Sequence, residues 1–250
     1  MSRKKTHKKS GFGILKTAFW TVSVFGIATA AVLGGLYLEK NTRITDVAVT
    51  GNYFTDENTI LESIDSPVGL LADSLNYSEM YSSIRTLPYV DDVDIRMSFR
   101  GTLTFDISEV SPIALLTEGN QRVYVSKGGV KLPLKPEKTV DVPILYGFPA
   151  SSVSDTLKSD AFQQVQQFLT AAKDDGFSWV TISEVAWNNR EGVVALSHEN
   201  GVKLIFGKDN FEQKMTHWRA FYTDVIAQKG IDSFHEIDLR FSNQIVTRKP

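Results

Sequence analysis

Four histidines and a run of aspartates are the residues of this sequence whose types could support catalysis or metal binding. The histidines do not stand at zinc-ligand spacings, and no carboxylate pattern accompanies them. Asp91, Asp92 and Asp94 are close enough in sequence to share a cation, but they lack the loop spacing and closing glutamate of a calcium-binding hand. The histidines are His7, His198, His217 and His235. These residue types predict solvated or half-buried positions and no metal site.

Cysteine is absent, which excludes disulfides, thiolate zinc sites, iron–sulfur clusters and cysteine nucleophiles. No Gly-x-Ser-x-Gly, Gly-x-Gly-x-x-Gly or Walker sequence occurs, and Ser-x-x-Lys occurs only as Ser2-Arg3-Lys4-Lys5 in the basic tail. Residues 126–129, Ser-Lys-Gly-Gly, are faintly similar to a nucleophile motif, but a β-turn explains them better. We therefore predict a protein that is not an enzyme and binds neither a cofactor nor a small-molecule substrate.

Charge is unevenly distributed along the 250 residues. Six of the 27 Lys and Arg residues precede Glu39, which is the first acidic residue. The remainder of the chain therefore holds 21 basic and 29 acidic side chains. This acidic excess argues against nucleic-acid binding, which needs a basic surface.

Residues 17–38 form an uncharged stretch of 22 residues. As a helix it would be about 33 Å long, enough to cross a hydrocarbon core of about 30 Å. The preceding basic residues predict a cytoplasmic tail over 1–16, a single transmembrane helix over 17–38 and an extracytoplasmic remainder. The alternative is a cleaved signal peptide, because Ala28-Thr29-Ala30 resembles a cleavage site.

Residues 44–112 predict a compact β-α-α-β-β domain. The second helix opens at Asn76, with Glu79 as its capping-box partner. Apolar residues alternate over 93–99 and again over 103–107, which indicates two strands of a sheet covered on one face by the helices. If both apolar sets face one core, Phe99 pairs with Leu103 across a three-residue loop.

Residues 118–250 predict a second, mixed β-rich domain with two helices, so the fold class is α+β. One helix is expected over 155–174 and another from Phe211 to a stop at Gly230. Asn200-Gly201 is a turn dipeptide between two apolar runs and predicts a hairpin.

The final strand is expected to alternate Ile237, Leu239 and Phe241 and to continue to Val246. A strand at the end of the chain has no successor to pair with it, so it is a candidate sheet edge. An edge can accept a partner's strand through main-chain hydrogen bonds. The alternative is that this strand is central or covered.

Several short motifs, in this order and spacing, resemble the FtsQ/DivIB family of bacterial cell division proteins. That family combines a basic tail, one membrane span, a POTRA domain and a β domain. Departures from its usual pattern are Phe99-Arg100 in place of Trp-Pro, Val110 in place of a basic residue and Lys127 in place of an acidic one. The matching motifs are Val47-x-Val49-x-Gly51-Asn52, Leu87-Pro88-Tyr89-Val90, Glu109-Val110-Ser111-Pro112-Ile113-Ala114, Gly129-Val130-x-Leu132-Pro133, Pro143-Ile144-Leu145-x-Gly147, Asn200-Gly201-Val202 and Ile237-Asp238-Leu239-Arg240-Phe241.

The resemblance implies a non-enzymatic, single-pass scaffold of the inner cell membrane at the division septum. Such proteins bind the division partners FtsB and FtsL through the last strand of the β domain. The corresponding positions here are Arg240, Phe241, Ser242, Asn243, Gln244, Ile245 and Val246. Arg240 would pair with an acidic partner side chain, and Phe241 would pack at the contact; the alternative for Arg240 is an internal ion pair with Asp238 or Glu236.

The family's POTRA domain is linked to recruitment to midcell, and a second candidate partner face includes Arg85, Tyr89 and Val90, on a surface expected to be exposed. Two competing hypotheses remain open. The first is a POTRA module of an outer-membrane assembly or secretion system, which would require a β-barrel. The second is an anchored envelope hydrolase with an unfamiliar active site.

Overall fold

The structure, a computed structural model, describes residues 20, 22–33, 42–151 and 155–249. The chain divides into two compact units. The N-terminal unit contains the chain up to Asn52 together with Glu57–Ile84 and Val93–Ile107. The C-terminal unit contains Tyr53–Asp56, Arg85–Asp92 and everything from Ser108 onward.

The predicted membrane span lies partly outside the described residues. Of residues 17–38, position 20 and positions 22–33 are described, and they are helical. Within the part of the chain that the structure describes, no helix combines the length and hydrophobicity needed to cross a bilayer. The span and the tail at 1–16 therefore stay predictions.

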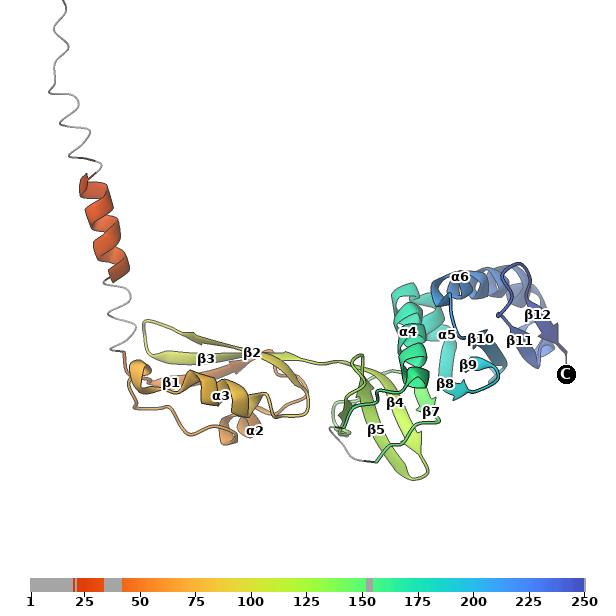
Figure 1. Cartoon of the computed structure of the whole chain (residues 1–250), viewed down its shortest axis with the longest axis horizontal. Helices are drawn as coiled ribbons and strands as arrows, with labels where there is room; N and C mark the ends of the chain where they lie inside the picture. The colour runs from red at the N-terminus through yellow and green to blue at the C-terminus, as the bar shows by residue number, and fades with distance from the viewer. Residues whose placement is uncertain (1–19, 21, 34–41, 152–154, 250) are drawn as a thin grey trace, which may run out of the picture. The chain divides into compact units, whose positions relative to one another are not determined.

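The N-terminal unit is a three-stranded sheet covered on one face by helices, as the β-α-α-β-β pattern predicts (Figure 1). The strand order is β1-β3-β2, with β1 parallel to β3. Side chains from strands and helices form the core, and Ile44, Ile60, Ile84, Leu103 and Phe105 are at most 1% exposed. The elements are β1 (Asp46–Thr50), α2 (Glu57–Glu62), the 3₁₀ turn η1 (Ala72–Ser74), α3 (Tyr77–Ile84), β2 (Val90–Met97) and β3 (Thr102–Glu109).

The pairing of Phe99 with Leu103 is wrong. The amide of Ser98 donates to the carbonyl of Thr102 at 2.9 Å, so Phe99, Arg100 and Gly101 form the turn. Gly101 closes this turn at φ +90°, a conformation that side-chain-bearing residues rarely adopt. Because Phe99 lies in the turn rather than in the strand, its side chain is 78% exposed.

The C-terminal unit is built on a nine-stranded mixed sheet with the order β12-β11-β10-β9-β8-β7-β4-β5-β6. The strands are β4 (Pro112–Glu118), β5 (Gln121–Ser126), β6 (Lys131–Leu132), β7 (Ile144–Tyr146), β8 (Ile182–Asn188), β9 (Gly192–Ser197), β10 (Lys203–Gly207), β11 (Glu236–Asp238) and β12 (Val246–Arg248). The helices are α4 (Asp160–Asp175), α5 (Phe177–Thr181), α6 (Phe211–Phe221), the π-helical turn η2 (Tyr222–Ile226), α7 (Ala227–Lys229) and the 3₁₀ turn η3 (Ile231–Ser233).

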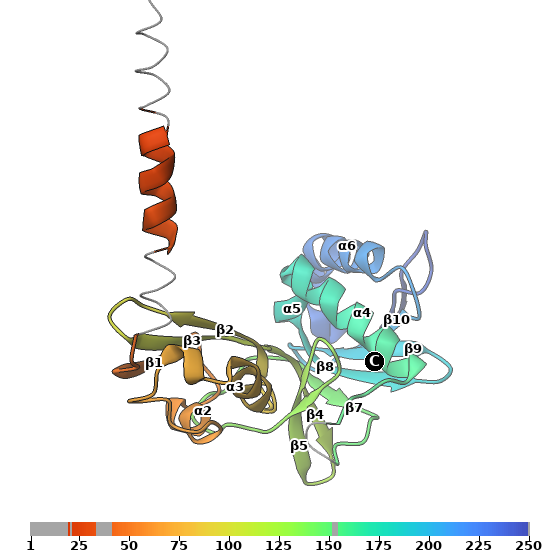
Figure 2. The same cartoon turned by 60° about the vertical axis from the view of Figure 1, so that its left-hand side comes forward.

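Helices α4 and α6 pack beside each other on the sheet (Figure 2). Phe168 of α4 meets Phe206 of β10 and Phe211 of α6 with ring centroids 4.8 and 5.6 Å apart. Trp218 is fully buried, and its indole N–H donates to Thr181 Oγ1 at 2.9 Å. These aromatic contacts fix the two helices against the strands that carry the C-terminal edge of the sheet.

The helix predicted from residue 155 begins at Asp160 instead. Residues 155–157 are extended, because the amide of Leu157 donates to the Gly129 carbonyl and the amide of Lys131 donates to the Asp155 carbonyl. Ser159 then caps α4 by accepting the Phe162 amide at 3.2 Å. Hydrogen bonds to residues 129–131 thus keep residues 155–157 extended, although the spacing of apolar residues alone would place them in the helix.

Candidate partner-binding site

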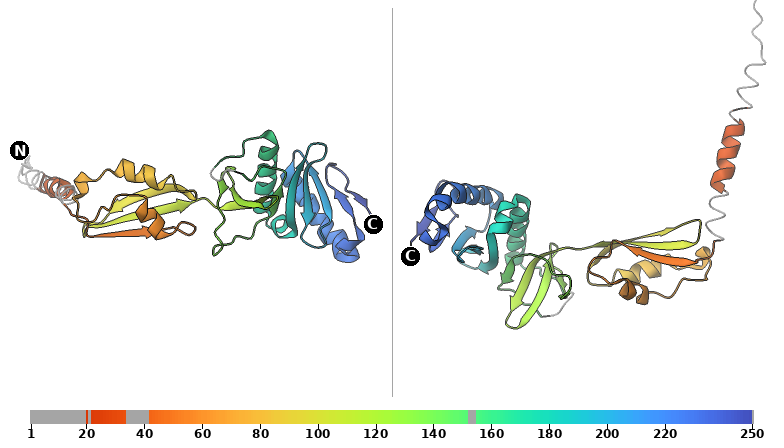
Figure 3. Two further views of the ribbon diagram at one scale, coloured as in Figure 1. Left: turned by 90° about the horizontal axis from the view of Figure 1, so that it is seen from below. Right: turned by 180° about the vertical axis from the view of Figure 1, so that it is seen from behind.

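Strand β12 forms one edge of the nine-stranded sheet. It pairs antiparallel with β11, and β11 in turn pairs parallel with β10. The C-terminus lies at this end of the sheet (Figure 3). A sheet edge near the end of the chain is therefore present, but its residues are Val246–Arg248, while Glu236–Asp238 is an inner strand.

The expected continuous strand from Ile237 to Val246 is wrong, because the chain reverses between β11 and β12. Asp238 ends β11 by accepting the main-chain amide of Arg240 on its own Oδ1 at 3.0 Å. A short acceptor side chain that bonds the amide two residues on forms a local turn and stops a strand. The predicted contact residues 240–245 consequently form a loop rather than a strand, and residues 240–244 of this loop are exposed.

Arg240 pairs internally with Asp238, which was the alternative interpretation of this residue. Its Nε donates to Asp238 at 2.9 and 3.1 Å, and its Nη2 donates at 2.5 Å. Burial alone would raise the pKa of Asp238, but the bonds from the Arg240 side chain and amide outweigh burial and lower it. The Arg240 side chain remains 38% exposed, so part of it faces solvent.

The remaining predicted contact residues lie on the loop and on β12. Phe241 and Val246 are 44% and 41% exposed, so both place apolar surface beside the sheet edge. Ile245 is half-buried and packs against the core of the unit. The polar residues between them, Ser242, Asn243 and Gln244, are exposed.

A groove of 460 Å³ adjoins the loop. Its far wall comes from α6 and the π-helical turn, including His217 and Phe221, and its near wall is the loop residues 242–245. Sequence analysis missed this groove and the edge residues Thr247 and Arg248. The spacing of apolar residues in α6 indicated which of its side chains are buried. It did not indicate which face of the helix lies next to the loop 242–245.

Charged side chains flank the edge across three strands. Lys203 of β10 donates to Glu191 and Glu236 at 2.9 and 3.0 Å, and Arg248 of β12 lies 3.4 Å from Glu236. Burial alone would lower the pKa of Lys203, but its bonds to the two glutamates outweigh burial and raise it. The charged side chains Lys203, Glu236 and Arg248 beside the edge are therefore all in ion pairs.

The second predicted partner face is not exposed as expected. Tyr89 and Val90 are only 1% and 8% exposed, whereas Arg85 is exposed. The Tyr89 ring stacks on Phe54 at 4.4 Å, and its hydroxyl donates to the Pro133 carbonyl at 2.6 Å. Because Tyr89 belongs to an apolar cluster of the C-terminal unit, it cannot present its side chain to a partner.

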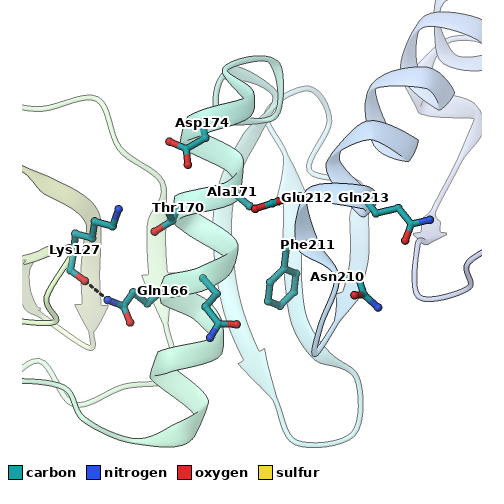
Figure 4. A pocket seen from close by; sticks show the side chains of 10 residues that line it. Lys127, Gln166, Thr170, Ala171, Asp174, Asn210, Phe211, Glu212 and Gln213 are labelled. Atoms are coloured by element: carbon teal, nitrogen blue, oxygen red, sulfur yellow. Dashed lines mark hydrogen bonds between the residues drawn. The ribbon is translucent and has the colours of Figure 1, made fainter.

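A polar cavity of 640 Å³ lies between α4 and the start of α6 (Figure 4). Gln166 donates to the Lys127 carbonyl at 2.5 Å on its wall. Half of its lining residues carry an amide or a hydroxyl, and Asp174 and Glu212 add carboxylates. Over residues 42–151 and 155–249, no three His, Asp or Glu side chains gather in a way that could hold a metal ion.

Comparison with known proteins gives consistent matches. Residues 111–248 match the family described as FtsQ/DivIB, C-terminal related. The chain is 23% identical to the cell division protein FtsQ of Salinibacter ruber, over 94% of this chain and 93% of that protein. It is 24% identical to the cell division protein FtsQ of Rhodothermus marinus, over 99% of this chain and 92% of that protein. A solved extracytoplasmic domain of the cell division protein DivIB from Geobacillus stearothermophilus aligns over 50% of this chain and 98% of that one, with 19% identity and a TM-score of 0.32.

Proposed function

The chain belongs to the FtsQ/DivIB family of cell division proteins, and on that premise we propose that it is a non-enzymatic, membrane-anchored scaffold of the division machinery. Residues 17–38 are the proposed membrane anchor, with residues 1–16 in the cytoplasm. The folded units would then lie outside the cytoplasm, at the septum, where they hold other division proteins together.

The observation that carries this proposal is the sheet edge at β12, bordered by exposed apolar residues and an open groove. An edge strand offers a row of main-chain donors and acceptors to an extended partner segment. Phe241 and Val246 add apolar side chains beside that row. A partner strand that pairs with β12 could also place a side chain in the adjoining 460 Å³ groove.

We assign the partner role to extracytoplasmic segments of FtsB- and FtsL-type division proteins. Main-chain pairing on β12 would supply affinity, while Phe241 and the groove would supply specificity. Arg240 would meet an acidic partner side chain with the part of its guanidinium that Asp238 leaves exposed. Strand β12 is short and ends at the charged Arg248, with Lys249 directly after it, and both features disfavour pairing with strands of other proteins.

Binding of the full-length chain in detergent to FtsB/FtsL-type segments tests this function. We expect Phe241→Glu to weaken binding by about 1–3 kcal/mol, as truncation of an interface anchor does. A chain that stops after Ile245 should lose binding, because it lacks β12. Val180→Glu is the matched control, since Val180 is 68% exposed on α5, outside the proposed surface.

Equal binding by the wild type, Phe241→Glu and the truncated chain would show that β12 is not the partner site. Absence of binding by the wild type itself would contradict the proposed partners. Loss of binding in Val180→Glu as well would point to general destabilisation, which melting temperatures of the same samples would reveal.

A further inference from the structure

Three segments of the N-terminal unit meet at the end where the chain enters from residue 42. We call this end the tip, and it comprises residues 43–45, 67–71 and 98–101. The amide of Ile44 donates to the Leu70 carbonyl at 2.9 Å, and the amide of Gly69 donates to the Ile44 carbonyl at 2.8 Å. The amide of Thr45 donates to the Gly101 carbonyl at 2.9 Å, which ties the β2–β3 turn to the same place. Figure 1 shows this turn beside the start of β1.

The tip exposes a group of large apolar side chains. Phe99 is 78% exposed, Val68 53%, Leu70 47% and Leu71 38%. In contrast, Ile44 and Leu103, which adjoin these residues in the structure, are at most 1% exposed. Single exposed apolar residues are common, but several gathered at one end of a small unit mark a surface that contacts something else.

The chain itself indicates what lies opposite the tip. Only four residues separate the end of the apolar stretch, Leu38, from Arg43. Even fully extended, the five peptide steps from Leu38 to Arg43 span at most about 18 Å. If residues 17–38 cross the membrane, this tether keeps the tip within about 18 Å of the hydrocarbon core, so the tip can reach the headgroup layer, which is about 6 Å deep on each side.

The charges of the tip fit this position. Its charged residues are Arg43 and Arg100, both exposed, while Asp46 and Asp65 lie just outside it. A guanidinium matches phosphate geometry, and long basic side chains can reach lipid headgroups while their stems stay in apolar surroundings. Aromatic and aliphatic side chains beside such cations are the composition of surfaces that lie at a membrane interface.

We propose that the tip inserts Phe99, Val68 and Leu70 into the boundary between headgroups and acyl chains, so that the N-terminal unit docks on the lipid surface next to its own anchor. This inference rests on the membrane anchor proposed above. It assigns to the β2–β3 turn a role separate from the partner edge at β12. The occupant of the apolar surface is lipid, and not a second copy of the chain or a partner protein.

The full chain offers a direct test because it contains no cysteine. Phe99→Cys, labelled with an environment-sensitive fluorophore, is reconstituted into vesicles of phosphatidylethanolamine and phosphatidylglycerol. Thr50→Cys is the control, because Thr50 is exposed at the opposite end of β1. We expect the label at 99 to emit at shorter wavelength and to be quenched severalfold more than the label at 50 by lipids with a quencher near the headgroup.

Similar emission and quenching at both positions would overturn the inference. A shift to shorter wavelength at 99 without lipid quenching would mean that protein covers the tip, which also overturns it. Flotation of the same vesicles separates this failure from failure of the anchor. A protein that does not float with the vesicles contradicts the proposed anchor and the docked tip together, whereas a floating protein with an unquenched label contradicts only the tip.

Discussion

Tyr89 shows how one side chain can serve the fold where sequence suggested an interface. Its ring stacks on Phe54 with an interplanar angle of 13°, and its hydroxyl donates to the Pro133 carbonyl. Burial raises the pKa of this hydroxyl, with smaller contributions from Tyr124 and Glu109. The raised pKa keeps the phenol protonated at neutral pH, so its hydroxyl is available as a donor.

Replacing Tyr89 with phenylalanine should lower the free energy of unfolding by about 1–3 kcal/mol, because the Pro133 carbonyl would lose its donor in a buried setting. Urea denaturation of the two proteins measures this difference. Tyr53→Phe is the matched control, since Tyr53 is 59% exposed and should change the free energy by less than about 0.5 kcal/mol. Equal effects of the two substitutions would contradict the role given to the buried hydroxyl.

Asp238 makes the stability of the sheet edge depend on pH. Its pKa is lowered in the folded protein, so its contribution is fully present above the unfolded value of about 3.9 and is lost as the pH falls through the folded value. The stability difference between wild type and Asp238→Asn should therefore shrink between pH 7 and pH 3. Thermal unfolding across this range measures it, with Asp141→Asn as an exposed control. A difference that stays constant with pH would contradict this account.

At the scale of elements, the binding of a partner strand to β12 should depend on main-chain amides and can be tested without changing the apolar side chains of the loop. Neighbouring residues in a strand direct their amides to opposite sides, so of Val246 and Thr247 one amide faces β11 and the other faces outward. Proline removes the amide at its position. We expect one of Val246→Pro and Thr247→Pro to keep the wild-type melting temperature and nevertheless to lose binding of the FtsB/FtsL-type segment.

The other proline variant should lower the melting temperature, because it removes a hydrogen bond between β12 and β11. Melting curves and binding isotherms of both variants decide the matter. A stable proline variant that binds like the wild type would exclude strand pairing on β12 and would leave Phe241 and the groove as the remaining contact surface.

Short sequence patterns predicted those elements that depend on interactions between residues close together in the sequence. Asn76 caps α3 by accepting the Glu79 amide on Oδ1 at 3.2 Å, and its side-chain Nδ2, rather than the main-chain amide of a full capping box, donates to the Glu79 carboxylate at 3.0 Å. The hairpin at Asn200-Gly201 forms because both residues adopt φ +59°, which this dipeptide tolerates. Strand β4 is different: four of its seven residues are buried, including three in succession, so it lacks the alternation by which a half-exposed strand is recognised.

The strand expected near residue 240 was located only in part. The alternation of Ile237 and Leu239 indicated β11, which is an inner strand, whereas the edge is β12. The reversal after Asp238 arises from a side-chain bond to the Arg240 amide, and the periodicity of apolar residues carries no trace of it. The groove beside the loop depends on how α6 and residues 242–245 approach each other, which is a tertiary property.

At the scale of the whole molecule, the chain passes between its two units more than once. Residues 53–56 and 85–92 belong to the C-terminal unit, although residues of the N-terminal unit flank both segments. Glu109 secures the first segment by accepting the amides of Tyr53, Phe54 and Thr55 at 2.6–2.7 Å. Sequence patterns lead to the prediction of domains that are continuous in the chain. The segments 53–56 and 85–92 can be assigned to the C-terminal unit only from their contacts in the structure.

The exchanged segments limit how this protein can be recombined. A graft that moves only residues 111–248 onto another anchor would carry Tyr124 and Leu132 without Phe54 and Tyr89, which complete their cluster. The transplanted module would begin with part of its interior open to water. A chimeric division protein should therefore receive the chain from before Tyr53, which is longer than the segment 111–248 that matches the C-terminal family.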